Sequence, residues 1–142
     1  MNVNRYTEVS MGPNIIKGYK ELVKEANDEI ETISIQQAIL LRDNKDYEFI
    51  DLRDFREIQR SGKIPGAFSC PRGMLEFWID PESPYHREIF STNKNFVFYC
   101  ASAWRSALAT KAAQDMGLEK VSHIEGGFTN WISAGGRVEK IT

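Results

Sequence analysis

One stretch decides the fold of this chain: Phe96-Val97-Phe98-Tyr99-Cys100-Ala101-Ser102-Ala103-Trp104-Arg105-Ser106. Residues 96–99 are all aromatic or β-branched, which is the pattern of a strand covered on both faces. From Arg105 onward, apolar residues recur at helical spacing, so a tight loop leads into a helix. Cys100 therefore stands where a strand gives way to a helix N-terminus. The free N–H groups and the positive dipole end there favour an anion, and a thiolate is one.

Strands and helices alternate on both sides of this stretch. Alternation of this kind predicts an α/β fold, a parallel sheet with helices on both faces. In such sheets the site lies at the carboxyl ends of the strands, where Asp51 and Cys100 both fall. We expect a loose arm over 1–17, helices over 18–30, 34–42 and 54–61, strands over 31–33, 47–52 and 67–69, and short helical turns over 74–78.

Composition excludes several functional classes. With a net charge of -2, the chain lacks the excess positive charge that attracts nucleic acid or an anionic membrane. No stretch is long enough to span a membrane, and the N-terminus lacks an apolar signal core, so we expect a cytoplasmic protein. Two cysteines in 142 residues do not suggest a disulfide framework, and a reducing compartment suits a reactive thiol.

Several short motifs, in order, resemble the rhodanese (sulfurtransferase) family. Four residues separate Cys100 from Arg105, and Ser106 follows, as in the active-site loop of that family's single-domain members. The resemblance covers most of residues 31–140. Its other segments are Glu48-Phe49-Ile50-Asp51-Leu52-Arg53, Gly62-Lys63-Ile64-Pro65-Gly66-Ala67, Pro71-Arg72-Gly73 and Ile124-Glu125-Gly126-Gly127-Phe128 with Trp131.

The resemblance implies a rhodanese-like, five-stranded, mainly parallel sheet flanked by helices on both faces. We expect an N-terminal arm and helix over 1–30, followed by a rhodanese-like domain over 31–142. The helix at the N-terminus and an insertion over 79–92 are available for a protein partner.

The resemblance also implies a sulfurtransferase in which Cys100 is the catalytic nucleophile. The cysteine takes a sulfane sulfur from thiosulfate, polysulfide or a persulfide and passes it to a thiol or cyanide. No metal or organic cofactor is implied, and a sulfur-relay protein is left open as a partner, with no nucleic acid and no membrane. The amides expected to hold the persulfide belong to Ala101, Ser102, Ala103, Trp104, Arg105 and Ser106.

Three further residues are expected to support the loop. Asp51 is expected to accept hydrogen bonds that fix neighbouring loops. Arg53 and Glu57 are expected to form local ion pairs, which are of small energetic worth if exposed. Arg72 either lines the site or is linked to a carboxylate. Arg105 is expected to brace the loop against Asp51 or Asp54, and the alternative is that it holds an anionic donor.

The loop carries no basic residue except Arg105, although family members that use thiosulfate well often place basic residues there. We therefore hypothesise that polysulfide or a persulfide, and not thiosulfate, is the physiological donor. The Trp104 side chain is expected either to form an apolar wall beside the sulfur or to be buried in the core. Many family members have glycine where Ala103 stands.

The sequence around the second cysteine and around the two histidines indicates no specific chemistry. Cys70 is expected to fill the core, and the alternative is a thiol that resolves an oxidised Cys100. His86 is expected in a solvated loop and His123 as a structural residue of the last strand; their spacing suggests no metal site.

Two other classes compete with a sulfurtransferase. One is a phosphatase or arsenate reductase of the same fold, which the short loop disfavours because related phosphatases have five residues between cysteine and arginine. The other is an interaction domain that has lost its chemistry, which an intact Cys100 disfavours.

Overall fold

Five short strands form one parallel sheet in the computed structural model, which describes residues 12–141. The strands follow the order β1-β5-β4-β2-β3, and every neighbouring pair is parallel. This confirms the predicted α/β class and the five-stranded sheet. The strand bounds are β1 (Glu31–Ile33), β2 (Tyr47–Asp51), β3 (Phe68–Ser69), β4 (Asn95–Tyr99) and β5 (Val121–Ile124).

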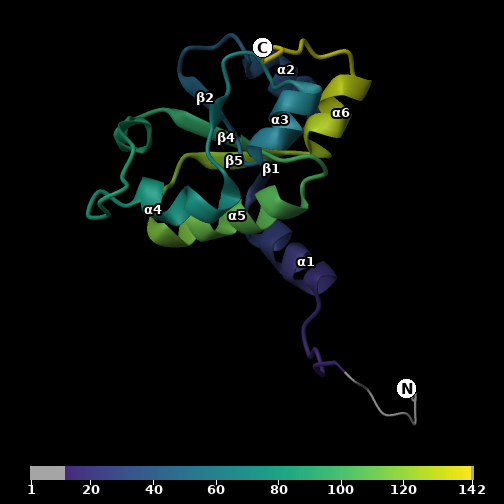
Figure 1. The fold of residues 1–142 in the computed structure, drawn as a ribbon, viewed down its shortest axis with the longest axis vertical. Coiled ribbons are helices and arrows are strands. Elements are labelled where there is room, and N and C mark those ends of the chain that lie inside the picture. The colour runs from purple at the N-terminus through teal and green to yellow at the C-terminus, as the bar shows by residue number, and fades with distance from the viewer. Residues whose placement is uncertain (1–11, 142) are drawn as a thin grey trace.

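Helices cover both faces of the sheet, as predicted (Figure 1). The helices α2, α3 and α6 lie on one face, and α4 and α5 lie on the other, with α1 against α5. The helix bounds are α1 (Tyr19–Glu29), α2 (Ile35–Leu41), α3 (Phe55–Ser61), α4 (Leu75–Ile79), α5 (Trp104–Met116) and α6 (Gly127–Ser133), with short 3₁₀ turns η1 (Arg72–Met74) and η2 (Glu88–Ser91).

Alternation along the central strands divides the apolar side chains between two cores. Phe49, Val97 and Tyr99 belong to the core that Trp131 of α6 completes. Phe96 and Phe98 belong to the opposite core, which packs under α4 and α5. Because successive side chains of a strand point to opposite faces, an unbroken apolar run serves both cores at once.

Local capping explains where two helices begin. The Ser34 hydroxyl accepts a hydrogen bond from the Gln37 amide at the start of α2. Asp54 and Glu57 form a reciprocal capping box at the start of α3, satisfying amides that the helix itself leaves unpaired. In each pair the two capping residues lie within four residues of one another. The sequence alone therefore located both helix starts correctly.

The first helix packs along α5. Residues 12–18, which precede it, contain no helix or strand, and residues 1–11 of the predicted arm lie outside the described part of the chain. The predicted domain boundary at residue 30 remains a prediction. Within residues 12–141, no helix combines the length and the apolar character needed to cross a membrane.

Candidate active site

Cys100 follows the last residue of the central strand β4 and is 1% exposed. The chain then curls through 101–103 into α5, and the Ser106 amide turns back to donate a hydrogen bond to Cys100 Sγ at 3.3 Å. The predicted loop therefore encloses the sulfur and directs a helix N-terminal N–H at it. Such a donor stabilises negative charge on the sulfur.

Ala103 adopts the left-handed conformation at the entry to α5, with φ of 75°. It is the one non-glycine residue with positive φ among residues 12–141. A side chain in this conformation costs about 1–2 kcal/mol. The strain lies three residues from the sulfur, at the turn that directs the following amides back toward it.

The first turn of α6 holds the outer side of the loop. The amides of Phe128 and Thr129 donate to the carbonyls of Cys100 and Ala101 at 2.8 and 3.1 Å. A Cβ on Gly127 would lie 2.5 Å from the Cys100 carbonyl oxygen, and its φ is +64°. Only glycine allows this approach, which explains why the Gly126-Gly127 turn precedes α6.

Arg105 braces the loop against α3, but through a carboxylate other than the two expected. Its two terminal nitrogens lie 2.8 and 3.0 Å from the two carboxylate oxygens of Glu57, so Asp51 and Asp54 were the wrong partners. The hydrogen bond from Arg105 is the main cause that lowers the pKa of Glu57 to about 2. Because Glu57 also caps α3, the brace joins the start of α3 to the start of α5.

Asp51 and Arg53 form a buried ion pair, so Arg53 is not the exposed residue for which a weak local ion pair was expected. Asp51 accepts from Arg53 Nη2 at 2.8 Å and from Arg53 Nε at 3.0 Å, and Arg53 is only 2% exposed. The guanidinium also donates to Ser61 Oγ and to the Gly62 carbonyl, and it lies 4.2 Å from the Phe128 ring centre. Arg53 thus joins β2, the end of α3 and α6.

Two predicted site residues have other surroundings. Arg72 pairs with Glu76 at 3.0 Å, which is the carboxylate link considered as its alternative. Trp104 is 53% exposed, so it does not tuck into the core. Its ring packs against Tyr19 of α1, with the two ring centres 4.9 Å apart.

A buried network that the sequence did not reveal extends from the loop to α1. Ser106 Oγ and His123 Nδ1 are 2.8 Å apart, and His123 Nε2 lies 3.0 Å from Asn27 Oδ1. Because an amide oxygen only accepts, the Nε2 atom carries the proton, and Ser106 donates to Nδ1. Burial lowers the pKa of His123 to about 4, so the ring is neutral near neutral pH. No local pattern signals contacts between residues 96 positions apart.

Cys70 is a buried thiol of the core below α4 and α5. Burial raises its pKa to about 12. Cys70 and Cys100 follow β3 and β4 at the same level, because Asp51 of β2 pairs with Ser69 on one side and Tyr99 on the other. Two strand spacings separate the two residues by roughly 10 Å, too far for a disulfide without backbone movement. This geometry favours the core-filling reading of Cys70.

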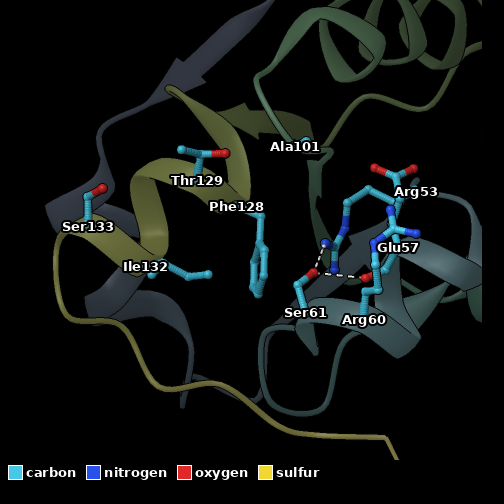
Figure 2. A pocket seen from close by; sticks show the side chains of 9 residues that line it. All are labelled: Arg53, Glu57, Arg60, Ser61, Ala101, Phe128, Thr129, Ile132 and Ser133. Carbon is cyan, nitrogen blue, oxygen red and sulfur yellow. Dashed lines mark hydrogen bonds between the residues drawn. The ribbon is translucent and has the colours of Figure 1, made fainter.

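A pocket of about 310 Å³ borders the loop (Figure 2). Side chains of α6 form one wall, and Arg53 with side chains of α3 forms the other. Ala101 is the residue of the loop that lines the pocket. In the part of the chain that the structure describes, no cluster of three or more metal-ligating side chains exists. The pocket is lined by Arg53, Glu57, Arg60, Ser61, Ala101, Phe128, Thr129, Ile132 and Ser133.

Comparisons with known proteins agree on one family. The family model for the rhodanese-like domain matches residues 34–134. The mouse thiosulfate sulfurtransferase/rhodanese-like domain-containing protein 3 is 30% identical over 106 residues, 71% of this chain and 68% of that protein.

Similar solved structures include the following two. A protein of unknown function from Rhodopseudomonas palustris, described as a possible tyrosine phosphatase, is 57% identical with a TM-score of 0.89, covering 92% of this chain and 100% of that one. The polysulfide-sulfur transferase homodimer of Wolinella succinogenes is 29% identical with a TM-score of 0.65, covering 87% of this chain and 88% of that one.

Proposed function

Because this chain belongs to the rhodanese-like domain family, we propose that it is a sulfurtransferase that carries sulfane sulfur as a persulfide on Cys100. The observation that carries the proposal is the Ser106 amide at 3.3 Å from Cys100 Sγ, at the end of a loop with four residues between Cys100 and Arg105. The fold thus supplies an anion-stabilising donor to a cysteine at the carboxyl end of a central strand.

The proposed reaction has two half-reactions with no net redox change. The Cys100 thiolate attacks the outer sulfur of the donor, an S–S bond forms on Sγ, and the donor remainder leaves with the electron pair of its broken bond. An acceptor thiolate or cyanide then attacks the outer sulfur, and the Sγ–S electron pair returns to Cys100. Alternation of donor and acceptor predicts ping-pong kinetics.

The protein's contribution is a fixed set of charges and dipoles around the sulfur. The Ser106 N–H donates to the sulfur, and the Arg105–Glu57 ion pair holds the first turn of α5 in place. A preorganised donor costs no reorganisation when negative charge moves between sulfur atoms. The scheme requires no metal or organic cofactor.

We propose polysulfide or a low-molecular-weight persulfide as the donor in preference to thiosulfate. Arg105 is the loop's single cation, and Glu57 already neutralises it through two hydrogen bonds. No charge in the loop is therefore left to balance the thiosulfate dianion. Turnover compared between thiosulfate and polysulfide tests this preference, and faster turnover with thiosulfate contradicts it.

Intact mass after incubation with each donor tests the proposal directly. We expect the protein to gain one sulfur atom, and cyanide to remove it. Cys100→Ser abolishes the gain, whereas Cys70→Ser retains it because that thiol is buried and protonated. Loading that survives Cys100→Ser contradicts the proposed role of Cys100. No loading from either donor contradicts the proposal and favours an interaction domain.

A phosphatase is the second candidate, because the similar R. palustris protein is described as a possible one. The four-residue loop disfavours it, since related phosphatases have one residue more. Hydrolysis of an aryl phosphate by the wild type, lost in Cys100→Ser, would support this alternative. The two free thiols suit a reducing compartment, and we propose the cytoplasm.

A further inference from the structure

Ser106, whose amide donates to the sulfur, is held at three atoms. As one of the first residues of α5 it has no helical carbonyl to receive its N–H, which lies 3.3 Å from Cys100 Sγ. Its Oγ atom lies 2.8 Å from His123 Nδ1, and its carbonyl accepts from Thr110 Oγ1 at 2.6 Å. Ser106 and His123 are both buried, so solvent does not compete for these bonds.

The sheet fixes the position of His123 relative to the sulfur. His123 on β5 pairs with Phe98 on β4, two residues before Cys100. The sulfur and the acceptor of the Ser106 hydroxyl thus belong to adjacent, hydrogen-bonded strands. The bond from Ser106 to His123 therefore ties the first turn of α5 to the strand beside the sulfur.

Asn27 of α1 determines which nitrogen of the His123 ring carries the proton. Its Oδ1 atom lies 3.0 Å from His123 Nε2 and can only accept, so Nε2 is protonated and Nδ1 offers a lone pair. Thr32 Oγ1, 3.1 Å from the same nitrogen, can donate as well as accept and does not fix the tautomer by itself. Burial lowers the pKa of His123 to about 4, which leaves that lone pair free at neutral pH.

Contacts at both ends of α1 hold Asn27 in place. Tyr19, the first residue of α1, packs on Trp104, with the ring centres 4.9 Å apart. The carbonyl of Glu29, the last residue, accepts from Gln114 Nε2 at 2.9 Å. Asn27 precedes the segment that matches the family model, so a helix outside that segment reaches the loop through His123.

We propose that His123 is a positioning residue for Cys100. By accepting the Ser106 O–H it keeps the Ser106 amide directed at the sulfur, and Asn27 keeps the ring in the tautomer that can accept. The ring neither gains nor loses a proton in this role. The inference deepens the proposed function, on which its meaning for sulfur transfer rests.

Two variants of similar size separate this role from core packing. His123→Asn keeps an acceptor oxygen close to the position of Nδ1, whereas His123→Leu has none. Both remove the ring and its bond to Asn27, so both are expected to lower stability. A ring that only fills the core would affect Cys100 alike in the two variants.

Alkylation of Cys100 by iodoacetamide measures the thiolate and needs no sulfur donor. The rate is followed at Cys100 by peptide mass, on folded protein across a pH series. We expect His123→Leu to slow alkylation about tenfold at neutral pH and to move its pH profile to higher pH, because the amide is less well directed. His123→Asn is expected to stay within about threefold of wild type, and Thr32→Val to match it.

A double variant tests whether His123 acts through Ser106. We expect Ser106→Ala to slow alkylation as His123→Leu does, and the two together to be no slower than either alone. Independent, additive losses overturn the proposal. Equal rates in His123→Leu and His123→Asn, or a wild-type rate in His123→Leu, also overturn it.

Nitrogen NMR of the His123 ring tests the tautomer without altering the core. We expect the wild-type ring to carry its proton on Nε2. Asn27→Leu, at an exposed position, is expected to move part of the population to Nδ1–H, whereas Thr32→Val is not. A wild-type ring protonated on Nδ1 overturns the proposal. If Cys100 takes up no sulfur while the alkylation effects are found, the proposed function fails and the positioning role stands.

Discussion

Ala103 occupies a backbone conformation that glycine adopts at little cost. Its φ of 75° places a Cβ where the left-handed region penalises one. We expect Ala103→Gly to raise the free energy of unfolding by about 1 kcal/mol, because the strain is relieved. Urea denaturation measures the change.

The control for this variant is Ala101→Gly, in the same loop but without positive φ. Glycine relieves nothing there and adds disorder to the unfolded chain, so stability falls. Destabilisation by Ala103→Gly would show that the alanine methyl makes contacts worth more than its strain.

Contacts between residues that are near in sequence were predicted well, whereas contacts between residues that are distant in sequence were not. The spacing of Cys100, Arg105 and Ser106 is a local signal, and the structure places all three in one loop. Arg105 pairs with Glu57, which lies 48 positions away in the chain. Asp51 and Asp54 lie close to Glu57 in the sequence, so sequence alone does not show which carboxylate is the partner. Nor does local pattern distinguish an exposed arginine from Arg53, whose burial depends on α6 closing over it.

The brace between α3 and α5 is an interaction of elements. Glu57→Gln is expected to lower the free energy of unfolding by about 1 kcal/mol at neutral pH, as for a partly exposed ion pair. The pKa of Glu57 falls from 4.5 to about 2 on folding, so this stability is present above 4.5 and disappears as pH falls toward 2. Urea midpoints of both proteins should therefore converge in acid.

Glu76→Gln is the matched control, because Glu76 pairs with Arg72 and not with a residue of α5. We expect Glu57→Gln to slow sulfur loading of Cys100, and Glu76→Gln to leave it unchanged. Equal loading rates in wild type and Glu57→Gln would show that the brace does not order the loop.

Element boundaries followed from signals within single segments. Asp54 with Glu57 and Ser34 with Gln37 located two helix starts, and the apolar run of β4 identified a strand buried on both faces. The packing of α1 against α5 could not be predicted from the sequence. It depends on side chains such as Tyr19 and Trp104, which meet only after folding.

At the scale of the whole molecule, His123 couples folding to pH. Its pKa falls from 6.5 to about 4 by burial, and its ring contacts Ser106, Asn27 and Thr32, none of which titrates in this range. A histidine held neutral stabilises the fold fully above 6.5. This stability is lost as pH falls toward 4, by up to about 1.4 kcal/mol per pH unit.

His123→Gln keeps hydrogen-bonding capacity but cannot take up the proton. We expect the stability gap between wild type and His123→Gln to narrow as pH falls from 6.5 toward 4, measured by urea denaturation. Thr32→Val, which removes one hydrogen bond from the same ring, is expected to lower stability equally at each pH. If the difference in stability between wild type and His123→Gln stays constant with pH, the His123 ring has the same pKa in the folded and unfolded states.

The grip of α6 on the loop has a consequence for turnover. With the Cys100 and Ala101 carbonyls tied to α6 amides, neither peptide is free to flip its oxygen toward the sulfur. In the proposed sulfurtransferase reaction, the sulfur would therefore meet the same dipoles whether bare or carrying a second sulfur atom. We therefore expect the two proposed half-reactions to share one conformation of the loop.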